Sequence, residues 1–275
     1  MIEVGRSNTL QILRETPQGL RLGTDEHNLL LPRRWVPEQL PDDGWLEVFV
    51  FTDSEDRLIA TTDRPRASVG EFACMEVVDL TRIGAFVDWG LPKDLLVPFR
   101  RQHAPLRLGQ KVVVAVSLDE ATERVIGSTK LSAYLDRDVS GIEPMQAVRL
   151  LVYGFNELGA LVVVDGRYGG LLYKDRIYQR LRIGQELDGT VLKVRDDGRL
   201  DITLQRPGRE GNSDAERAIL RALDEGQGQL DLHDKSPPEA IQRRLGLSKK
   251  AFKRAVGSLY RARTIDLVDG GIRRV

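Results

Sequence analysis

The segment "KKAFKRAVGSLYRAR", which begins at Lys249, joins positive charge to the periodicity of a helix. Apolar side chains that recur every three or four residues predict one buried stripe and one solvent-exposed face. The buried stripe is expected to consist of Phe252, Val256, Leu259 and Tyr260. The exposed face then carries four cations near its start, namely Lys249, Lys250, Lys253 and Arg254. Cations placed in this way are suited to contact phosphate groups.

Positive charge is concentrated at this end of the chain. Residues 235–275 contain eleven basic and three acidic side chains, which gives a net charge of +8. The whole chain is neutral, with 41 basic and 41 acidic side chains, so the other residues carry −8. A basic surface that is merely solvated is the alternative interpretation, but the local excess favours contact with a polyanion.

Two further helices are predicted to precede the basic one. Ser213 and Glu216 form a capping-box pattern, and Ser236 and Glu239 repeat it around a proline at the first helical position. Gly246 has the position expected after a helix C-terminus. The final segment, "TIDLVDGGIRRV", reads as two strands joined by a glycine turn. This order of elements is typical of a winged helix-turn-helix. The outward residues of its third helix include no Asn or Gln, which favours contact with a phosphate backbone over reading of bases.

The rest of the chain contains a threefold repeat. The segments that start at Gly19, Gly84 and Gly159 each have a glycine, an alternating apolar strand, a turn, and two leucines that open a second strand. The second and third copies continue in parallel at an offset of 75 residues, as "LRLGQKVVVAV" and "LRIGQELDGTV" show. Each copy is therefore predicted to contain about five short strands, the outline of a small Greek-key barrel of the OB type.

The predicted fold is mostly β with a small α/β end: three tandem five-stranded OB-type barrels and a C-terminal winged helix-turn-helix domain. The expected boundaries are residues 1–64, 65–135 and 144–208 for the barrels and residues 212–275 for the winged helix. Strands two and three of such barrels commonly present a face that binds oligonucleotides. The fold alone does not establish binding, because barrels of this size carry many functions.

Several other classes of function find no support in the sequence. No apolar run approaches the roughly 18 residues of a membrane span, and the N-terminal segment lacks a signal-peptide pattern, so the cytoplasm is the expected compartment. Cys74 has no second cysteine to pair with, and the three histidines predict no zinc site. No phosphate loop or nucleophile elbow is present, so we expect neither an enzyme nor a cofactor or metal.

The repeat and the C-terminal segment resemble known families. The glycine, the Phe86-Val87 pair, the turn glycine and the two leucines resemble the S-one motif, an RNA-binding OB repeat. Three such barrels followed by "DKSPPEAIQRRLGLSKKAFKRAVGSLYRARTI" resemble the conserved virulence factor B family of bacterial RNA-binding proteins. The resemblance covers essentially the whole chain. It is most specific in "GLPKDLLVP" and in the helix from Lys249 to Tyr260, and weakest over residues 1–64.

The S-one resemblance implies two base-stacking positions in each barrel, one two residues after the glycine and one after the two leucines. The pairs are Arg21 and Leu31 in the first barrel, Phe86 and Val97 in the middle barrel, and Leu161 and Tyr173 in the third. Each barrel is thus only partly equipped for stacking. The middle barrel is the best candidate, with Trp89 in its turn. The cations expected to meet phosphates there are Lys93, Arg100, Arg101 and Lys111.

The resemblance implies a regulatory protein that binds single-stranded RNA with loose sequence preference and acts after transcription. Flat rings on an open sheet with cations beside them suit single-stranded RNA. Two alternatives remain open. One is a regulator that binds duplex DNA through the winged helix. The other is a scaffold that docks on ribosomal or transcriptional proteins.

Overall fold

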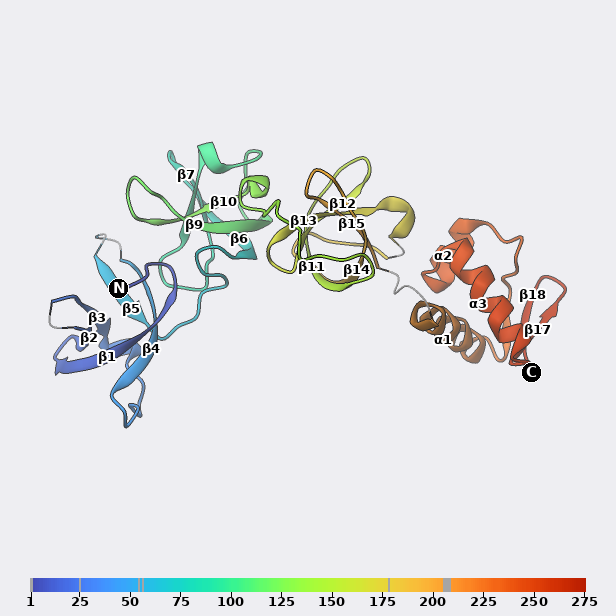
Figure 1. Cartoon of the computed structure of the whole chain (residues 1–275), viewed down its shortest axis with the longest axis horizontal. Coiled ribbons are helices and arrows are strands. Elements are labelled where there is room, and N and C mark those ends of the chain that lie inside the picture. Colours follow the sequence, from blue (N-terminus) through green and yellow to red (C-terminus); the bar gives the residue numbers. More distant parts are fainter. Residues whose placement is uncertain (1, 25, 54, 56, 178, 205–208) are drawn as a thin grey trace. The chain divides into compact units, whose positions relative to one another are not determined.

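The computed structural model describes residues 2–24, 26–53, 55, 57–177, 179–204 and 209–275, with the side chains of residues 209–213 outside this description. The chain forms β-barrels followed by a helical domain (Figure 1). It divides into two compact units, Met1–Leu135 and Asp136–Val275. Among the described residues, no helix is long and apolar enough to cross a membrane, and no group of three or more His, Cys, Asp or Glu side chains could hold a metal ion.

The first unit begins with a closed barrel. Its strands are β1 (Ser7–Thr16), β2 (Gly19–Gly23), β3 (Asn28–Pro32), β4 (Trp45–Thr52) and β5 (Leu58–Thr61). Their order around the barrel is β1-β2-β3-β5-β4, and β3 pairs with β5 in parallel. Because side chains alternate along a strand, Leu20 and Leu22 of β2 point into the core, where they are almost fully buried.

The second barrel is nearly closed. Its strands are β6 (Phe72–Leu80), β7 (Gly84–Val87), β8 (Leu95–Pro98), β9 (Lys111–Leu118) and β10 (Val125–Ser128), in the order β10-β9-β6-β7-β8. Within the described chain no ladder joins β8 to β10, although a Cβ added to Gly127 in β10 would lie 2.9 Å from the Val97 side chain in β8. The first two barrels share one hydrophobic core cluster.

The second unit begins with another closed barrel. Its strands are β11 (Ala147–Phe155), β12 (Gly159–Val164), β13 (Tyr168–Tyr173), β14 (Glu186–Val194) and β15 (Leu200–Thr203), arranged as in the first barrel. In every barrel the third strand leads into a short 3₁₀ helix. These helices are η1 (Arg33–Trp35), η2 (Phe99–Arg101) and η4 (Lys174–Arg176), and a further one, η3 (Leu131–Ala133), follows β10.

The repeated glycines mark the place where the second and third strands of each barrel lie closest. A Cβ added to Gly19, Gly84 or Gly159 would lie 2.0, 2.3 and 2.0 Å from the carbonyl oxygens of Leu31, Val97 and Leu172, respectively. These separations are far below a van der Waals contact, so only a residue without a side chain fits there. The sequence repeat therefore reflects a packing requirement.

The second unit ends in a winged helix domain. Its elements are α1 (Arg209–Glu225), β16 (Gln229–Leu230), α2 (Pro238–Leu245), α3 (Lys249–Arg261), β17 (Ile265–Val268) and β18 (Gly271–Arg274). Ile219, Ile241 and Phe252, one from each helix, are fully buried in a shared core. The two-residue strand β16, which was not predicted, pairs with β18. The predicted fold class is confirmed.

The predicted helix starts need correction. The backbone of α1 is helical from Arg209, so Ser213 lies inside the helix rather than at its N-cap, and its side chain is outside the described residues. Pro237 occupies the N-cap position of α2 without a side-chain cap. The Ser236 hydroxyl instead accepts a hydrogen bond from the backbone N–H of His233 at 3.0 Å, because the preceding turn uses it. Gly246 ends α2 as predicted, with φ of +68°.

We predict that Gly84→Ala destabilises the first unit by about 3 kcal/mol, because the new Cβ would force β7 and β8 apart. Urea unfolding of the full chain would measure the loss. Gly109→Ala is the matched control in the same barrel, since an added Cβ there meets nothing within 4 Å. Gly109 has φ of +73°, so its replacement should lose only about 1 kcal/mol from backbone strain. Equal losses in the two variants would contradict the steric explanation.

Candidate nucleic-acid interface

The outer face of β7 and β8 presents an aromatic ring. Ala85 and Val87 are fully buried, whereas Phe86 between them points outward and is half-buried. Leu96 lies directly opposite Phe86 in the antiparallel ladder and is also half-buried. Phe86 therefore lies on the strand-two and strand-three face that such barrels use for oligonucleotides.

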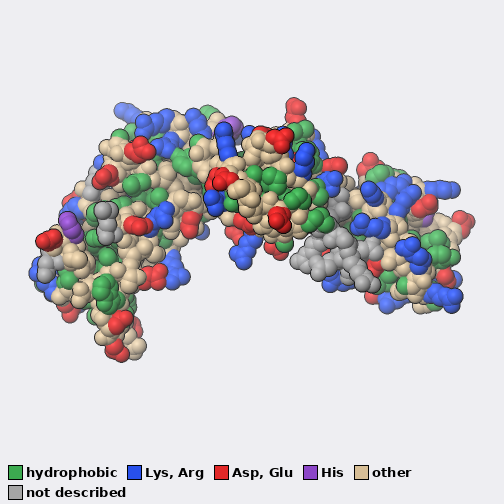
Figure 2. Space-filling view, viewed as in Figure 1, with side chains coloured by type: hydrophobic (Ala, Val, Ile, Leu, Met, Phe, Trp, Pro, Cys, Tyr) green, Lys and Arg blue, Asp and Glu red, His purple; other side chains and the backbone are tan. Residues whose placement is uncertain are grey.

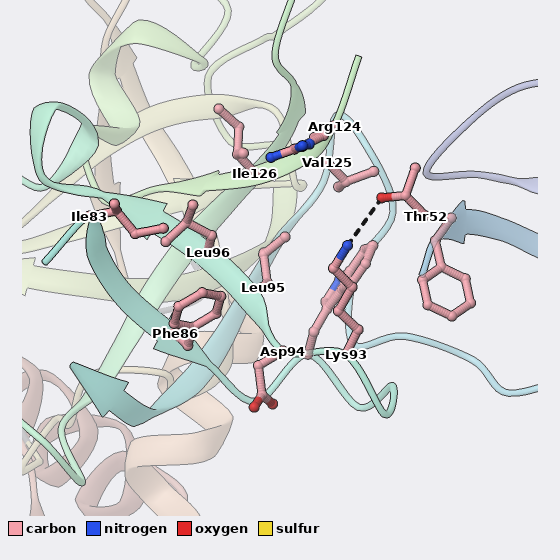
Figure 3. A pocket seen from close by; sticks show the side chains of 12 residues that line it. Thr52, Ile83, Phe86, Lys93, Asp94, Leu95, Leu96, Arg124, Val125 and Ile126 are labelled. Atoms are coloured by element: carbon pink, nitrogen blue, oxygen red, sulfur yellow. Dashed lines mark hydrogen bonds between the residues drawn. The ribbon is translucent and has the colours of Figure 1, made fainter. Parts of the chain in front are cut away.

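A cavity of about 220 Å³ opens beside this ring (Figure 3). Phe86, Leu96 and Ile83 contribute apolar surface to it. Arg124 and Ile126 line it from the start of β10. The cavity thus lies at the seam between β8 and β10 and combines flat apolar surface with a guanidinium group, which suits a base and its backbone.

Carboxylates limit where a phosphate can lie on this face. Asp79 pairs with Phe86 across β6 and β7, and Asp94 lines the cavity. Partial burial, together with the nearby carboxylates of Asp88 and Asp79, raises the pKa of Asp94. Asp88 and Asp94 both belong to the turn between β7 and β8. The Asp94 carboxylate disfavours a phosphate at this end, so phosphates are favoured toward the other end, where β7 begins and β8 ends.

Trp89 lies in the core, which corrects the prediction that it contacts nucleic acid. Its side chain is 3% exposed, and its Nε1 donates a hydrogen bond to the backbone oxygen of Ala67 at 2.7 Å. Its ring packs edge-to-face on Phe49 of the first barrel, with ring centroids 5.5 Å apart. The turn tryptophan therefore joins the first two barrels, and although it lines the same cavity as Phe86, too little of its side chain is exposed to stack on a base.

Lys93 is also engaged within the protein. Its Nζ donates a hydrogen bond to the backbone oxygen of Asp53 at 2.6 Å and lies 3.4 Å from the hydroxyl of Thr52 (Figure 3). In the same turn, Asp88 forms an ion pair with Arg66, which lowers the pKa of Asp88. The turn between β7 and β8 thus docks on the first barrel, and Lys93 holds it there, while its phosphate contact stays a prediction.

The other predicted cations of the middle barrel differ in their availability. Arg100 is exposed, with its guanidinium 3.3 Å from a carboxylate oxygen of Asp119. Arg101 is half-buried and donates a hydrogen bond to the Tyr134 hydroxyl. Lys111 is exposed on β9, a strand that does not border β7 or β8. Arg100 is therefore the predicted cation best placed beside the Phe86 face.

The strand registers correct the second stacking position. The ladders pair Gly19 with Pro32, Gly84 with Pro98, and Gly159 with Tyr173. The structural equivalents of Tyr173 are therefore Pro32 and Pro98. Leu31 and Val97, which counting from the two leucines assigns to this position, are fully buried. The count fails because the leucines of the first two barrels begin one register position earlier than those of the third.

Tyr173 lies on the outer face of the third barrel. Its hydroxyl donates a hydrogen bond to Asp201 at 3.2 Å, and partial burial together with the negative charge of Asp201 raises the pKa of Tyr173. Arg195 lies 3.9 Å from the same carboxylate. This face has a ring and a cation, but both are held by a carboxylate.

The exposed face of α3 is basic over its first two turns. Lys250, Lys253 and Arg254 are exposed, and Lys249 is half-buried at the start of the helix. No acidic residue occurs between Lys249 and Arg261. Within the described part of the chain, neither Lys250 nor Lys253 forms an ion pair. Lys and Arg side chains cover much of the visible face of this domain (Figure 2).

Tyr260 shares the basic face of α3, contrary to the prediction that it is buried. Its side chain is 50% exposed, whereas Phe252 and Leu259 are in the core. Tyr260 follows Lys253 by seven residues, which places the two on the same side of the helix. The eight-residue interval from Phe252 leads away from the apolar stripe, and this is why periodicity misplaced the tyrosine.

Two exposed apolar side chains at the phosphate-favouring end of the Phe86 face were not predicted. Ile83 is 60% exposed and Phe99 is 57% exposed. Ile83 precedes Gly84 in the turn before β7, and Phe99 follows Pro98 at the end of β8. Neither stands at a position that the S-one resemblance implies, so only the structure brings them to attention.

Barrels with an oligonucleotide-type face and a winged helix with a basic third helix define a multidomain chain of S1 and winged helix modules. Residues 4–63 match the family model of the S1 domain, which is the S-one motif. Residues 217–273 match the model of the CvfB-like winged helix domain. The S1 model thus matches the first barrel, although the sequence motif is weakest there.

Relatives of the chain extend over most of its length. The "Uncharacterized protein YitL" of Bacillus subtilis is 28% identical, covering 94% of this chain and 89% of that protein. "Conserved virulence factor B" of Staphylococcus haemolyticus is 26% identical, covering 82% of this chain and 77% of that protein. The resemblance to conserved virulence factor B is confirmed. A multidomain protein with nucleic acid binding domains from Streptococcus pneumoniae has a TM-score of 0.45 and 23% identity, over 99% of this chain and 98% of that chain.

We predict that Trp89→Ala lowers the free energy of unfolding of the first unit by about 3–5 kcal/mol, because it removes a buried ring between two barrels. Urea unfolding of the full chain would measure this loss. Phe86→Ala, which removes a half-exposed ring from the same hairpin, is the control and should lose about 1 kcal/mol or less. A stability unchanged by Trp89→Ala would contradict the structural role.

Proposed function

We propose that this protein binds single-stranded RNA with loose sequence preference and acts as a regulator after transcription. The observation that carries the proposal is the outward ring of Phe86 beside an open cavity on the middle barrel. The basic face of α3 supports it from a separate domain. Binding, rather than catalysis, is the activity that these surfaces suit.

The Phe86 face favours unpaired bases. A ring on a sheet can stack on a base only where the base is not covered by its neighbours in a duplex, so single strands are preferred. The carboxylates of Asp79 and Asp94 repel phosphates but can accept hydrogen bonds from sugar hydroxyls. The 2′-hydroxyl is the group that distinguishes RNA from DNA, and these acceptors therefore favour RNA.

The α3 face supplies the charge that the barrels lack. Its cations are lysines and arginines without Asn or Gln among them, which suits contact with the phosphate backbone rather than with base edges. Such contacts are strongly dependent on salt, because each neutralised phosphate releases a counterion. This arrangement supports binding that is tight at low salt and tolerant of sequence.

Four linked modules make weak sites effective. We propose modules at residues 1–64, 65–135, 144–208 and 212–275, which follow the expected boundaries. One stacked base contributes only about 1–3 kcal/mol, so Phe86 alone gives weak binding. Tethered modules raise one another's local concentration to about the millimolar range, which can strengthen binding by roughly 100-fold or more.

Duplex DNA and protein partners are the competing interpretations. Titration of salt against binding to single-stranded RNA, single-stranded DNA and duplex DNA separates them, with fluorescence anisotropy as the measurement. We expect single-stranded RNA to bind most tightly. Tighter, sequence-dependent binding to duplex DNA would overturn the proposal, and no binding to any nucleic acid at low salt would favour a protein scaffold.

We predict that Phe86→Ala weakens binding to a labelled oligouridylate by roughly fivefold or more, the lower limit for the loss of one stacked base. Phe86→Tyr should retain affinity, because it keeps a flat ring. Trp45→Ala is the control, since Trp45 is an exposed aromatic residue, 47% exposed, on the first barrel. Equal losses from the two alanine variants would argue against a specific role for Phe86.

We predict that the double variant Lys250→Ala/Lys253→Ala weakens binding and reduces the slope of log affinity against log salt by about 1.4. The reason is that each lysine that neutralises one phosphate of a single strand adds about 0.7 to this slope. The double variant Arg217→Ala/Arg221→Ala on α1 removes the same charge from another helix and is the control. An equal change of slope in both variants would show that net charge, rather than the α3 face, determines binding.

A further inference from the structure

In each barrel a side-chain oxygen holds the turn between the first two strands. We call this turn, which ends at Gly19, Gly84 or Gly159, the corner of the barrel. Thr81 Oγ1 donates a hydrogen bond to the backbone oxygen of Gly84 at 3.1 Å. Thr16 Oγ1 donates in the same way to Gly19 at 2.8 Å. In the third barrel, Asn156 Oδ1 accepts a hydrogen bond from the N–H of Gly159 at 3.0 Å. The corner is therefore a preformed part of all three barrels.

One backbone hydrogen bond connects each corner to the end of the third strand. The residue before the repeat glycine accepts it, and the first residue of the following 3₁₀ helix donates it. The donor–acceptor pairs are Arg33 with Gln18 at 2.8 Å, Phe99 with Ile83 at 3.4 Å, and Lys174 with Leu158 at 3.0 Å. Two residues, separated by about 15 residues of sequence, are thereby joined through their backbones in every barrel.

Only in the middle barrel are both side chains of this pair large, apolar and exposed. Ile83 and Phe99 are 60% and 57% exposed, and Leu80 at the end of β6 is 48% exposed. The third barrel keeps half of the arrangement, with Phe155 and Leu158 exposed by 51% and 57%. A group of exposed apolar side chains marks a contact site more often than an isolated exposed residue does.

The corner of the middle barrel continues the Phe86 face. Ile83 lines the same cavity as Phe86 and Leu96 (Figure 3). Phe99 adjoins Ile83 through the backbone hydrogen bond and lies at the end of the face that is remote from Asp88 and Asp94. A strand of nucleic acid with one base on Phe86 therefore has its next apolar contact at this corner.

The charges around the corner indicate which class of ligand it suits. Arg82 precedes Ile83 and is exposed, and Arg100 follows Phe99 with a side chain that is 69% exposed. Arg100 is 3.3 Å from Asp119, yet its side chain remains largely exposed, so an apolar corner with an arginine next in sequence to each of its two side chains suits a base and its adjoining phosphates. An apolar protein partner would leave both arginines at the edge of the contact without an assigned role.

We propose that Phe99 and Ile83 form a second base-binding position of the middle barrel, with Arg82 and Arg100 on the adjoining phosphates of a single-stranded nucleic acid. This inference rests on the proposed function and adds a site to it. The S-one resemblance assigns the second position to the equivalent of Tyr173, which is Pro98 here. The ring is one residue further along the chain, at Phe99, and it faces the corner.

The test is the binding of full-length variants to a labelled oligouridylate of about 16 nucleotides, the upper range for one OB fold. Phe99→Ala should weaken binding by roughly fivefold or more, and Phe99→Trp should retain or strengthen it. Phe99→Lys introduces the residue type found at the equivalent position of the third barrel, Lys174, and adds a positive charge. We expect it to weaken binding as well, because a stacking role requires the ring.

Leu108→Ala is the matched control, since Leu108 is 66% exposed on the same barrel and outside the corner. It should bind like the wild type. Circular dichroism and urea unfolding would establish that each variant is folded, as the exposure of Phe99 leads us to expect.

The outcomes distinguish this inference from the proposed function. If the wild type binds and Phe99→Ala binds equally well, the second position is wrong while the proposed function stands. If Phe99→Lys binds more tightly than the wild type, the corner acts through charge alone and the stacking role is overturned. If Phe99→Ala alters self-association in sedimentation without changing RNA binding, the corner is a protein contact. If the wild type binds no nucleic acid, the proposed function fails, and this site fails with it.

Discussion

Each barrel depends on one close approach, between a glycine that starts the second strand and a backbone carbonyl oxygen of the third. Side chains at these positions would lie about 2.0 to 2.3 Å from that oxygen, which no Cβ can do. The approach fixes the register of the two strands, and register decides which side chains face the core. The outward residue two positions later is Arg21, Phe86 or Leu161. The constraint that builds the barrel therefore also fixes the outward position to which the proposed function assigns base stacking.

Features that depend on local pattern could be predicted from the sequence. The threefold repeat, the order of helices and the hairpin with its glycine turn are all encoded in short segments. Trp89 and Lys93 could not be placed in this way, because their partners, Phe49 and Asp53, are about 40 residues away on another barrel. A tryptophan in a turn has the same local sequence whether it faces water or a neighbouring domain.

A second group of errors came from shifts of one residue. Counting from the two leucines placed Val97 on the outer face, yet the ladder places Pro98 there, and alternation turns Val97 into the core. Tyr260 likewise lies next to the buried stripe of α3 but on its exposed side. The N-cap prediction for Ser236 was wrong for a different reason. Its hydroxyl can cap a helix or hold the preceding turn, and in the structure it holds the turn. The sequence pattern therefore identifies the type of an element more reliably than the face on which each of its residues lies.

The two ends of the β7–β8 hairpin have different surroundings. Its turn end carries Trp89 and Lys93 and is occupied by the first barrel, and the carboxylates of Asp88 and Asp94 gather there. Its other end is exposed, apolar and flanked by arginines. Under the proposed function, Asp94 disfavours a phosphate at the docked end and the exposed arginines favour one at the other end, so charge orients a bound strand. Because the barrel supplies orientation but little net positive charge, the affinity must come from elsewhere in the chain. The basic face of α3, which contains no acidic residue, has the charge to supply it, and the proposed function therefore joins a weak stacking face to a cationic helix in one chain.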